Sequence, residues 1–64
     1  MLIKRSFSLA GHRTSVALEE EFWAALADAA KHENLALAAL VTRVDTERTT
    51  PLASALRVYA LRCR

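Results

Sequence analysis

Cysteine, glycine and proline each occur once in these 64 residues, and only two histidines are present. A single cysteine, Cys63, cannot form an internal disulfide, and His12, His32 and Cys63 are too few and too scattered for a structural zinc site. A chain of this length buries only about 60% of the surface that its unfolded form exposes, and commonly needs disulfides, a metal or a partner chain. Self-association is the support that remains, so the composition predicts a homo-oligomer without a cofactor.

Long apolar runs are also lacking. No run approaches the ~18 consecutive apolar residues of a membrane helix, and residues 1–5 have no apolar signal-peptide segment behind their charges. We therefore expect a cytoplasmic protein without membrane contact. A pocket that encloses a substrate needs more scaffold than this chain provides, so we expect no enzyme. An apolar content of 53% with so little glycine and proline excludes a disordered tail and favours a mostly helical, interface-rich protein.

The net charge is only +2, but its distribution is uneven. Residues 1–18 carry lysine and arginine without any acid, residues 19–33 are strongly acidic, and the arginines of residues 50–64 are unopposed. A local basic patch, rather than the total charge, attracts a phosphate backbone. The distribution therefore points toward a polyanionic partner.

Two short segments near the start of the chain alternate apolar and polar residues. Residues 13–18 do so over their whole length, which predicts a half-buried β-strand. One side of this strand carries Thr14, Val16 and Leu18, and the other carries Arg13, Ser15 and Ala17. Residues 6–9 alternate as well, which leaves two interpretations of the N-terminal segment 1–12. It is either an extended or loose arm, or an extra strand in a hairpin that turns at Gly11-His12 and sets Phe7 opposite Val16.

The chain after Glu19 has helical spacing and predicts three helices, over 20–33, 37–48 and 51–62. Glutamates open the first helix, where carboxylates oppose the positive end of the dipole, and Asn34 is expected to turn the chain at its end. Thr50 and Pro51 suit the N-cap and the first position of the third helix. With the strand, these helices form one domain over residues 1–64.

An isolated strand exposes unpaired main-chain N–H and C=O groups that another strand can satisfy. The same strand of a second copy is a natural partner, because antiparallel pairing about a two-fold axis turns both apolar sides toward the helices. The shared dimer core then comprises Val16, Leu18, Phe22, Leu26, Leu40, Val41 and Val44, with Trp23 at its edge. The opposite side forms a two-stranded ribbon that fits the major groove of B-DNA, which is about 12 Å wide.

Five blocks of the sequence resemble the ribbon-helix-helix DNA-binding superfamily, and its short bacterial members in particular. They are Lys4-Arg5-Ser6, residues 11–19 (GHRTSVALE), Phe22-Trp23 with Leu26, residues 34–37 (NLAL) leading into Leu40-Val41, and residues 54–57 (SALR). The resemblance implies a mostly α fold with one short β-strand, as an intertwined homodimer with an intermolecular antiparallel two-stranded ribbon and an extra C-terminal helix. It also implies double-stranded DNA of the bacterial nucleoid as the partner.

Carried over residue by residue, the base-reading positions are Arg13, Ser15 and Ala17. The planar guanidinium of Arg13 pairs with O6 and N7 of guanine. Ser15 donates or accepts one hydrogen bond at a base edge, and Ala17 contacts only a thymine methyl group. The phosphate contacts implied by the resemblance are Lys4, Arg5, His12, Leu37 and Ala38. Family members commonly place Ser or Thr at the start of the second helix, where this chain has Ala36, so only the main-chain N–H groups remain to hold a phosphate there.

These expectations describe a homodimeric, sequence-selective DNA-binding protein that represses transcription by occupying its site. The alternative is a protein-interaction or antitoxin-like dimer module with weak or no DNA binding, favoured by the small base-reading face, Ala36 and the acidic start of the first helix. A third interpretation makes residues 6–18 an intrachain hairpin. Four strands across a dimer would then be too broad to enter a groove, and DNA would bind another surface.

Overall fold

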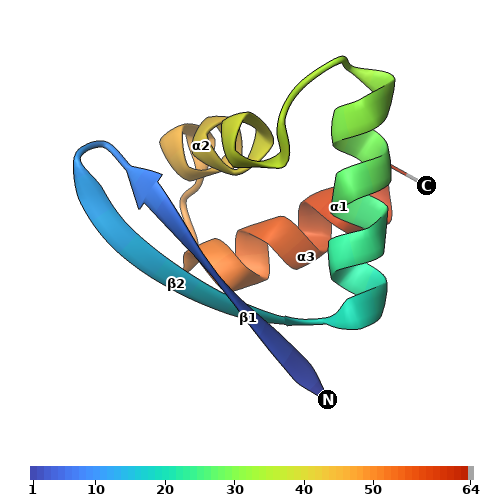
Figure 1. Cartoon of the computed structure of the whole chain (residues 1–64), viewed down its shortest axis with the longest axis horizontal. Helices are drawn as coiled ribbons and strands as arrows, with labels where there is room; N and C mark the ends of the chain where they lie inside the picture. Colours follow the sequence, from blue (N-terminus) through green and yellow to red (C-terminus); the bar gives the residue numbers. More distant parts are fainter. Residues whose placement is uncertain (64) are drawn as a thin grey trace.

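The computed structural model describes residues 1–63, so that Arg64, the last residue of the expected domain, lies outside the described part. Two strands are followed by three helices (Figure 1): β1 (Leu2–Leu9), β2 (His12–Glu19), α1 (Glu20–His32), α2 (Leu37–Glu47) and α3 (Leu52–Arg62). The strands form a hairpin; α1 and α3 pack against β2, and α2 packs against β1. Within residues 1–63, no helix is long and apolar enough to span a bilayer.

The N-terminal segment is a full strand, so the expectation of one short strand is wrong. β1 and β2 are eight residues each and pair antiparallel from Leu2 opposite Glu19 to Leu9 opposite His12. Ala10 and Gly11 form the connecting turn with φ of 51° and 82°. Positive φ at both central residues is the signature of a type I′ turn, whose twist matches that of the strands. Within one chain the N-terminal segment is therefore the extra strand of a hairpin, as the third interpretation of the sequence expected.

The hairpin turns one residue earlier than the sequence suggested, at Ala10-Gly11 rather than Gly11-His12. As a result Phe7 lies opposite Thr14, and Val16 lies opposite Arg5. The glycine takes the second central position, where φ is largest. The observed partner of Phe7, Thr14, is two residues from the expected partner, Val16. Because side chains alternate with a period of two, Phe7 still lies on the same face of the sheet as expected.

The ends of the helices follow local chemistry. Asn34 has a φ of 56°, which confirms it as the left-handed residue that ends α1. The N–H of Leu35 donates to the Ala30 carbonyl at 2.9 Å and that of Asn34 to the Lys31 carbonyl at 3.1 Å, as in a Schellman motif. α3 begins at Leu52, one residue later than expected, because Pro51 keeps an extended ψ of 145° and serves as the N-cap.

One hydrophobic core lies between the hairpin and the three helices. Its buried side chains come from every element: Phe7, Leu9, Val16, Leu18, Trp23, Leu26, Ala29, Ala30, Leu40, Val41, Val44, Leu52, Leu56 and Ala60. Six of the seven residues predicted for a shared dimer core are buried here within a single chain, whereas Phe22 is only partly buried and the adjacent Trp23 takes the central place. The Trp23 indole N–H donates to the Ile3 carbonyl at 2.8 Å, and its ring lies 5.9 Å from that of Phe7. β1 is thus an integral part of the core.

A polar cluster joins the three helices at the side chains of Glu33, Arg43 and Tyr59. Arg43 donates to both carboxylate oxygens of Glu33, at 2.9 and 2.8 Å, and to the Tyr59 hydroxyl at 2.7 Å. The hydroxyl in turn donates to Glu33 at 2.9 Å. These bonds lower the pKa of Glu33, while burial, followed by the hydrogen bond to Glu33, raises the pKa of Tyr59 to about 12. The cluster links the end of α1 to α2 and α3.

Candidate nucleic-acid interface

The outer face of the hairpin gathers polar side chains from both strands. Strand alternation turns Thr14, Val16 and Leu18 toward the helices and leaves the intervening residues on the outside. Four cross-strand pairs lie there: Ser8 with Arg13, Ser6 with Ser15, Lys4 with Ala17, and Leu2 with Glu19 at the end of the hairpin. All of these side chains are exposed except Ala17 and Glu19, which are half-buried. The structure therefore brings the three predicted base-reading residues together with Lys4.

Three of these pairs supply groups that suit base edges and phosphates. The Ser6 and Ser15 hydroxyl oxygens lie 3.2 Å apart in a hydrogen bond that either can donate. Arg13 has no ion-pair partner within residues 1–63, so its guanidinium is available for O6 and N7 of guanine. Lys4 likewise has none and adds a second positive charge to this face. The outer face thus offers hydroxyl groups and cations, with the Glu19 carboxylate at the end of the hairpin.

The main chain of β2 has one unpaired edge. In a two-residue hairpin the flanking pair, Leu9 with His12, is closed by main-chain hydrogen bonds, and hydrogen-bonded pairs alternate with non-bonded pairs from there. This rule directs the N–H and C=O groups of Arg13, Ser15 and Ala17 away from β1. The sheet has only two strands in the described chain, so this edge is open to a further strand. The residues on the outer face of β2 are the same residues whose main chain faces the open edge.

The acid at the end of β2 is neutralised. Glu19 lies 3.1 Å from the Arg57 guanidinium of α3, which also lies over the ring of Phe22 with 5.9 Å to the centroid. A hydrogen bond from its own main-chain N–H, together with Arg57, lowers the pKa of the Glu19 carboxyl. The carboxylate is therefore ionised but paired, which reduces its repulsion of phosphate near the ribbon.

Arg5 and His12, two of the predicted phosphate contacts, lie on the other face of the hairpin. Arg5 is opposite Val16, and its guanidinium carbon is 5.3 Å from the centre of the Trp23 ring, within cation–π range. His12 is exposed beside the turn and shares the side of Thr14 and Val16. The structure therefore separates both residues from Lys4 and Arg13.

The predicted phosphate site at the start of α2 lies away from the hairpin. Its N-cap is Ala36, without a side-chain cap, and its first turn holds no acidic residue. The N–H groups of Ala39 and Leu40 already bond to the Ala36 carbonyl, which leaves those of Leu37 and Ala38 as the open donors. Within residues 1–63, no hydrogen bond or ion pair connects this turn to the hairpin.

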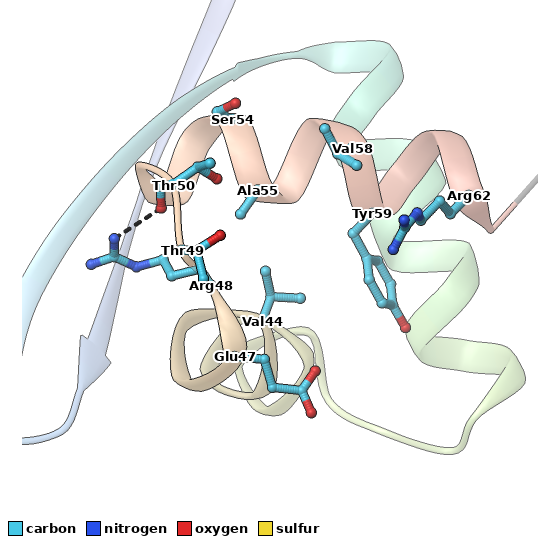
Figure 2. Close-up of a pocket in the computed structure, with 10 residues that line it drawn as sticks. All are labelled: Val44, Glu47, Arg48, Thr49, Thr50, Ser54, Ala55, Val58, Tyr59 and Arg62. Carbon is cyan, nitrogen blue, oxygen red and sulfur yellow. Dashed lines mark hydrogen bonds between the residues drawn. The ribbon is translucent and has the colours of Figure 1, made fainter.

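Two shallow hollows lie on other parts of the surface, and neither contains a predicted DNA-contacting residue. One, of about 330 Å³, lies between α2 and α3 and is drawn in Figure 2; Arg48 at its rim donates to the Thr50 carbonyl at 3.0 Å. The other, of about 390 Å³, is mainly apolar and lies between α1 and α3. It is lined by Glu21, Phe22, Ala25, Ala60 and Leu61.

Sequence reasoning missed the contribution of β1 to the outer face. Ser6 and Ser8 stand there beside Ser15 and Arg13, and neither serine was a predicted site residue. The signal was present, since the alternation of residues 6–9 places both serines on one side once the segment is a strand.

Comparison with known proteins agrees with this architecture. The family model described as "Ribbon-helix-helix domain" matches residues 2–63. Neither the curated proteins nor the solved structures contain a significant match.

Proposed function

Because the chain belongs to the ribbon-helix-helix family, we propose that it is a sequence-selective double-stranded DNA-binding protein that acts as a homodimer and represses transcription by occupying its site. Its place of action in this proposal is the bacterial nucleoid, in the cytoplasm. No catalytic step is required, since occupancy alone excludes other proteins from the same DNA.

The observation that carries the proposal is the coincidence of an open edge and a polar face on β2. Two copies that pair antiparallel at this edge satisfy each other's main-chain groups. The same pairing brings Arg13, Ser15 and Ala17 of both copies to the centre of one outer face. A pair of adjacent strands has the width that the major groove accepts. The two-fold symmetry of such a dimer requires a DNA site with matching half-sites.

The proposed contacts divide into those that read bases and those that hold phosphates. Arg13 reads guanine through its two parallel N–H donors, Ser15 adds a hydrogen bond, and Ala17 contacts a thymine methyl group. The N–H groups of Leu37 and Ala38, at the positive end of the α2 dipole, bind a backbone phosphate that the hairpin does not contact. Arg5 and His12 have no role in this proposal because they lie on the opposite face of the hairpin.

The decisive experiment is selection of duplex DNA from a random library with the full chain, followed by binding measurements on the enriched site and on a scrambled duplex. We expect Arg13→Ala to weaken binding to the enriched site by about 1–3 kcal/mol and to reduce the preference over the scrambled duplex. Arg62→Ala removes an exposed arginine at the end of α3 and serves as the matched control. Absence of an enriched motif, or equal effects of the two substitutions, would contradict the proposal.

The alternative is a protein-interaction or antitoxin-like module, and one observation favours it. The apolar hollow between α1 and α3 is flanked by Leu61, whose exposed fraction is 55%, and by the half-buried Phe22. Such a surface suits the apolar anchor of a protein partner. A co-purifying partner that is lost on Leu61→Asp, together with DNA binding that ignores Arg13→Ala, would support this module in place of the DNA-binding dimer.

A further inference from the structure

β1 has no part in the base-reading residues proposed above, yet it extends the same outer face. If β2 pairs with its copy at the open edge, β1 and its copy become the outer strands of a four-stranded sheet. Neighbouring strands lie about 4.8 Å apart, so the axes of the two outer strands are about 14 Å apart. The major groove is about 12 Å wide. The two β2 strands therefore fit between the groove walls, whereas each β1 lies over a wall, which is the sugar-phosphate backbone.

The side chains on the outer face of β1 suit that position. Ser6 and Ser8 are small, so the strand can approach the backbone closely, and their hydroxyl groups are donors to phosphate oxygens. Lys4 supplies a flexible positive charge that suits a phosphate. Lys4 and Ser8 make no side-chain hydrogen bond within residues 1–63, and Ser6 shares its hydroxyl with Ser15. β2, in contrast, carries the long planar side chain that reaches a base edge, Arg13.

We infer that β1 is a phosphate-clamping strand: Lys4 and Ser8 of each copy hold the two backbones that border the major groove, while β2 reads the bases between them. This inference rests on the proposed function and extends it, since it assigns separate tasks to the two strands of one hairpin. A broad four-stranded sheet then remains compatible with groove binding, because only its central half enters.

The test measures binding of the full chain to two duplexes, the enriched site and a scrambled sequence, across a series of salt concentrations. We expect Lys4→Ala to weaken binding to both duplexes by the same factor, because a phosphate contact carries no sequence information. It should also reduce the slope of log affinity against log salt by about 1.8 per dimer, since each lost phosphate contact accounts for about 0.9. Ser8→Ala should weaken both equally without a change of slope, because the hydroxyl is uncharged.

Lys31→Ala is the matched control, because it removes an exposed lysine from the last turn of α1, at the other end of the molecule from the hairpin turn (Figure 1). If Lys4→Ala behaves like this control on both duplexes, the inference is overturned. A loss confined to the enriched site would also overturn it, since Lys4 would then read bases. Failure of the proposed function is seen separately, as the absence of any preference in the unsubstituted chain or of any effect of Arg13→Ala.

Discussion

At the scale of single residues, the hairpin turn stores a small conformational cost at Ala10. Its φ of 51° lies in the left-handed region, where a residue with a Cβ is disfavoured by roughly 1–2 kcal/mol. Gly11 adopts its φ of 82° without such a cost. The preferred pair in a type I′ turn is Asn-Gly, because an asparagine side chain tolerates this conformation. This chain therefore has the preferred residue, glycine, at the second turn position but not at the first.

We predict that Ala10→Asn raises the free energy of unfolding by about 0.5–1 kcal/mol, by relieving the cost at the first turn position. For a domain of this size, that change corresponds to an increase in melting temperature of about 2–8 °C in a thermal denaturation experiment. Ala24→Asn, at an exposed position in α1, is the control and should lower the melting temperature, because asparagine is a poorer helix former than alanine. A destabilising effect of Ala10→Asn would show that the turn differs from type I′.

At the scale of the elements, the cluster of Glu33, Arg43 and Tyr59 fixes the relative positions of the three helices. The Arg43 guanidinium binds Glu33 through two parallel N–H groups, a geometry that Lys cannot reproduce. It also lies over the Tyr59 ring with 6.0 Å to the centroid. Each of the three side chains comes from a different part of the helical layer, so the cluster depends on the tertiary fold.

This cluster predicts an alkaline transition. The folded state holds the Tyr59 proton more tightly than the unfolded state, with a pKa of about 12 against 10.0, so its contribution to stability is complete below pH 10 and is lost as the pH rises toward about 12. Urea unfolding between pH 10 and pH 12 should show a falling free energy of unfolding. Tyr59→Phe should abolish the portion of this fall that comes from ionisation of the phenol. Tyr59 is the only tyrosine, so the absorbance of the phenolate reports its titration directly. A phenolate that forms near pH 10 in the folded protein would contradict the prediction.

The helices could be predicted from sequence because their signals are local. The spacing of Leu37, Leu40, Val41 and Val44 and the turn at Asn34 lie within a few residues of one another, and the observed bounds of α1 and α2 differ from the expected ones by one residue. The β2 strand extends the expected 13–18 by one residue at each end.

The features that escaped prediction depend on contacts between distant segments. The choice between Phe22 and Trp23 as the buried ring was decided by β1, where Ile3 offers a carbonyl to the indole and Phe7 offers its ring. The separation of Lys4 from Arg5 likewise requires that the segment be a strand with a known register. The cluster of Glu33, Arg43 and Tyr59 joins residues up to 26 positions apart, and no local pattern marks it.

At the scale of the whole molecule, the chain has a core of its own. Chain length alone predicts that a second copy supplies the missing strand, but β1 supplies a strand to β2 within the same chain. A second copy is therefore proposed for the other edge of β2, where it adds strand pairing and doubles the reading face.

Cross-linking tests the proposed dimer. In a Cys63→Ser background, which removes the exposed native thiol, we predict that Ser15→Cys is joined to its copy by a short bifunctional thiol reagent. Ser15 lies between Arg13 and Ala17 among the residues whose main chain faces the open edge, so the proposed pairing about their centre brings the two copies closest there. Lys31→Cys in the same background is the control and should remain monomeric on a denaturing gel. Equal cross-linking of the two variants would exclude pairing at β2.

The exposed edge of β1 influences whether the proposed dimer adds further strands. A sheet that gains strands at β2 leaves β1 and its copy at its borders, and a bare border is a template for further addition. Adjacent cations, Lys4 and Arg5, lie in the middle of this strand and project to its two faces. Two such borders brought together would set like charges side by side, which disfavours their pairing. In the proposed dimer, the charges of this N-terminal segment therefore disfavour the addition of further strands at the two borders.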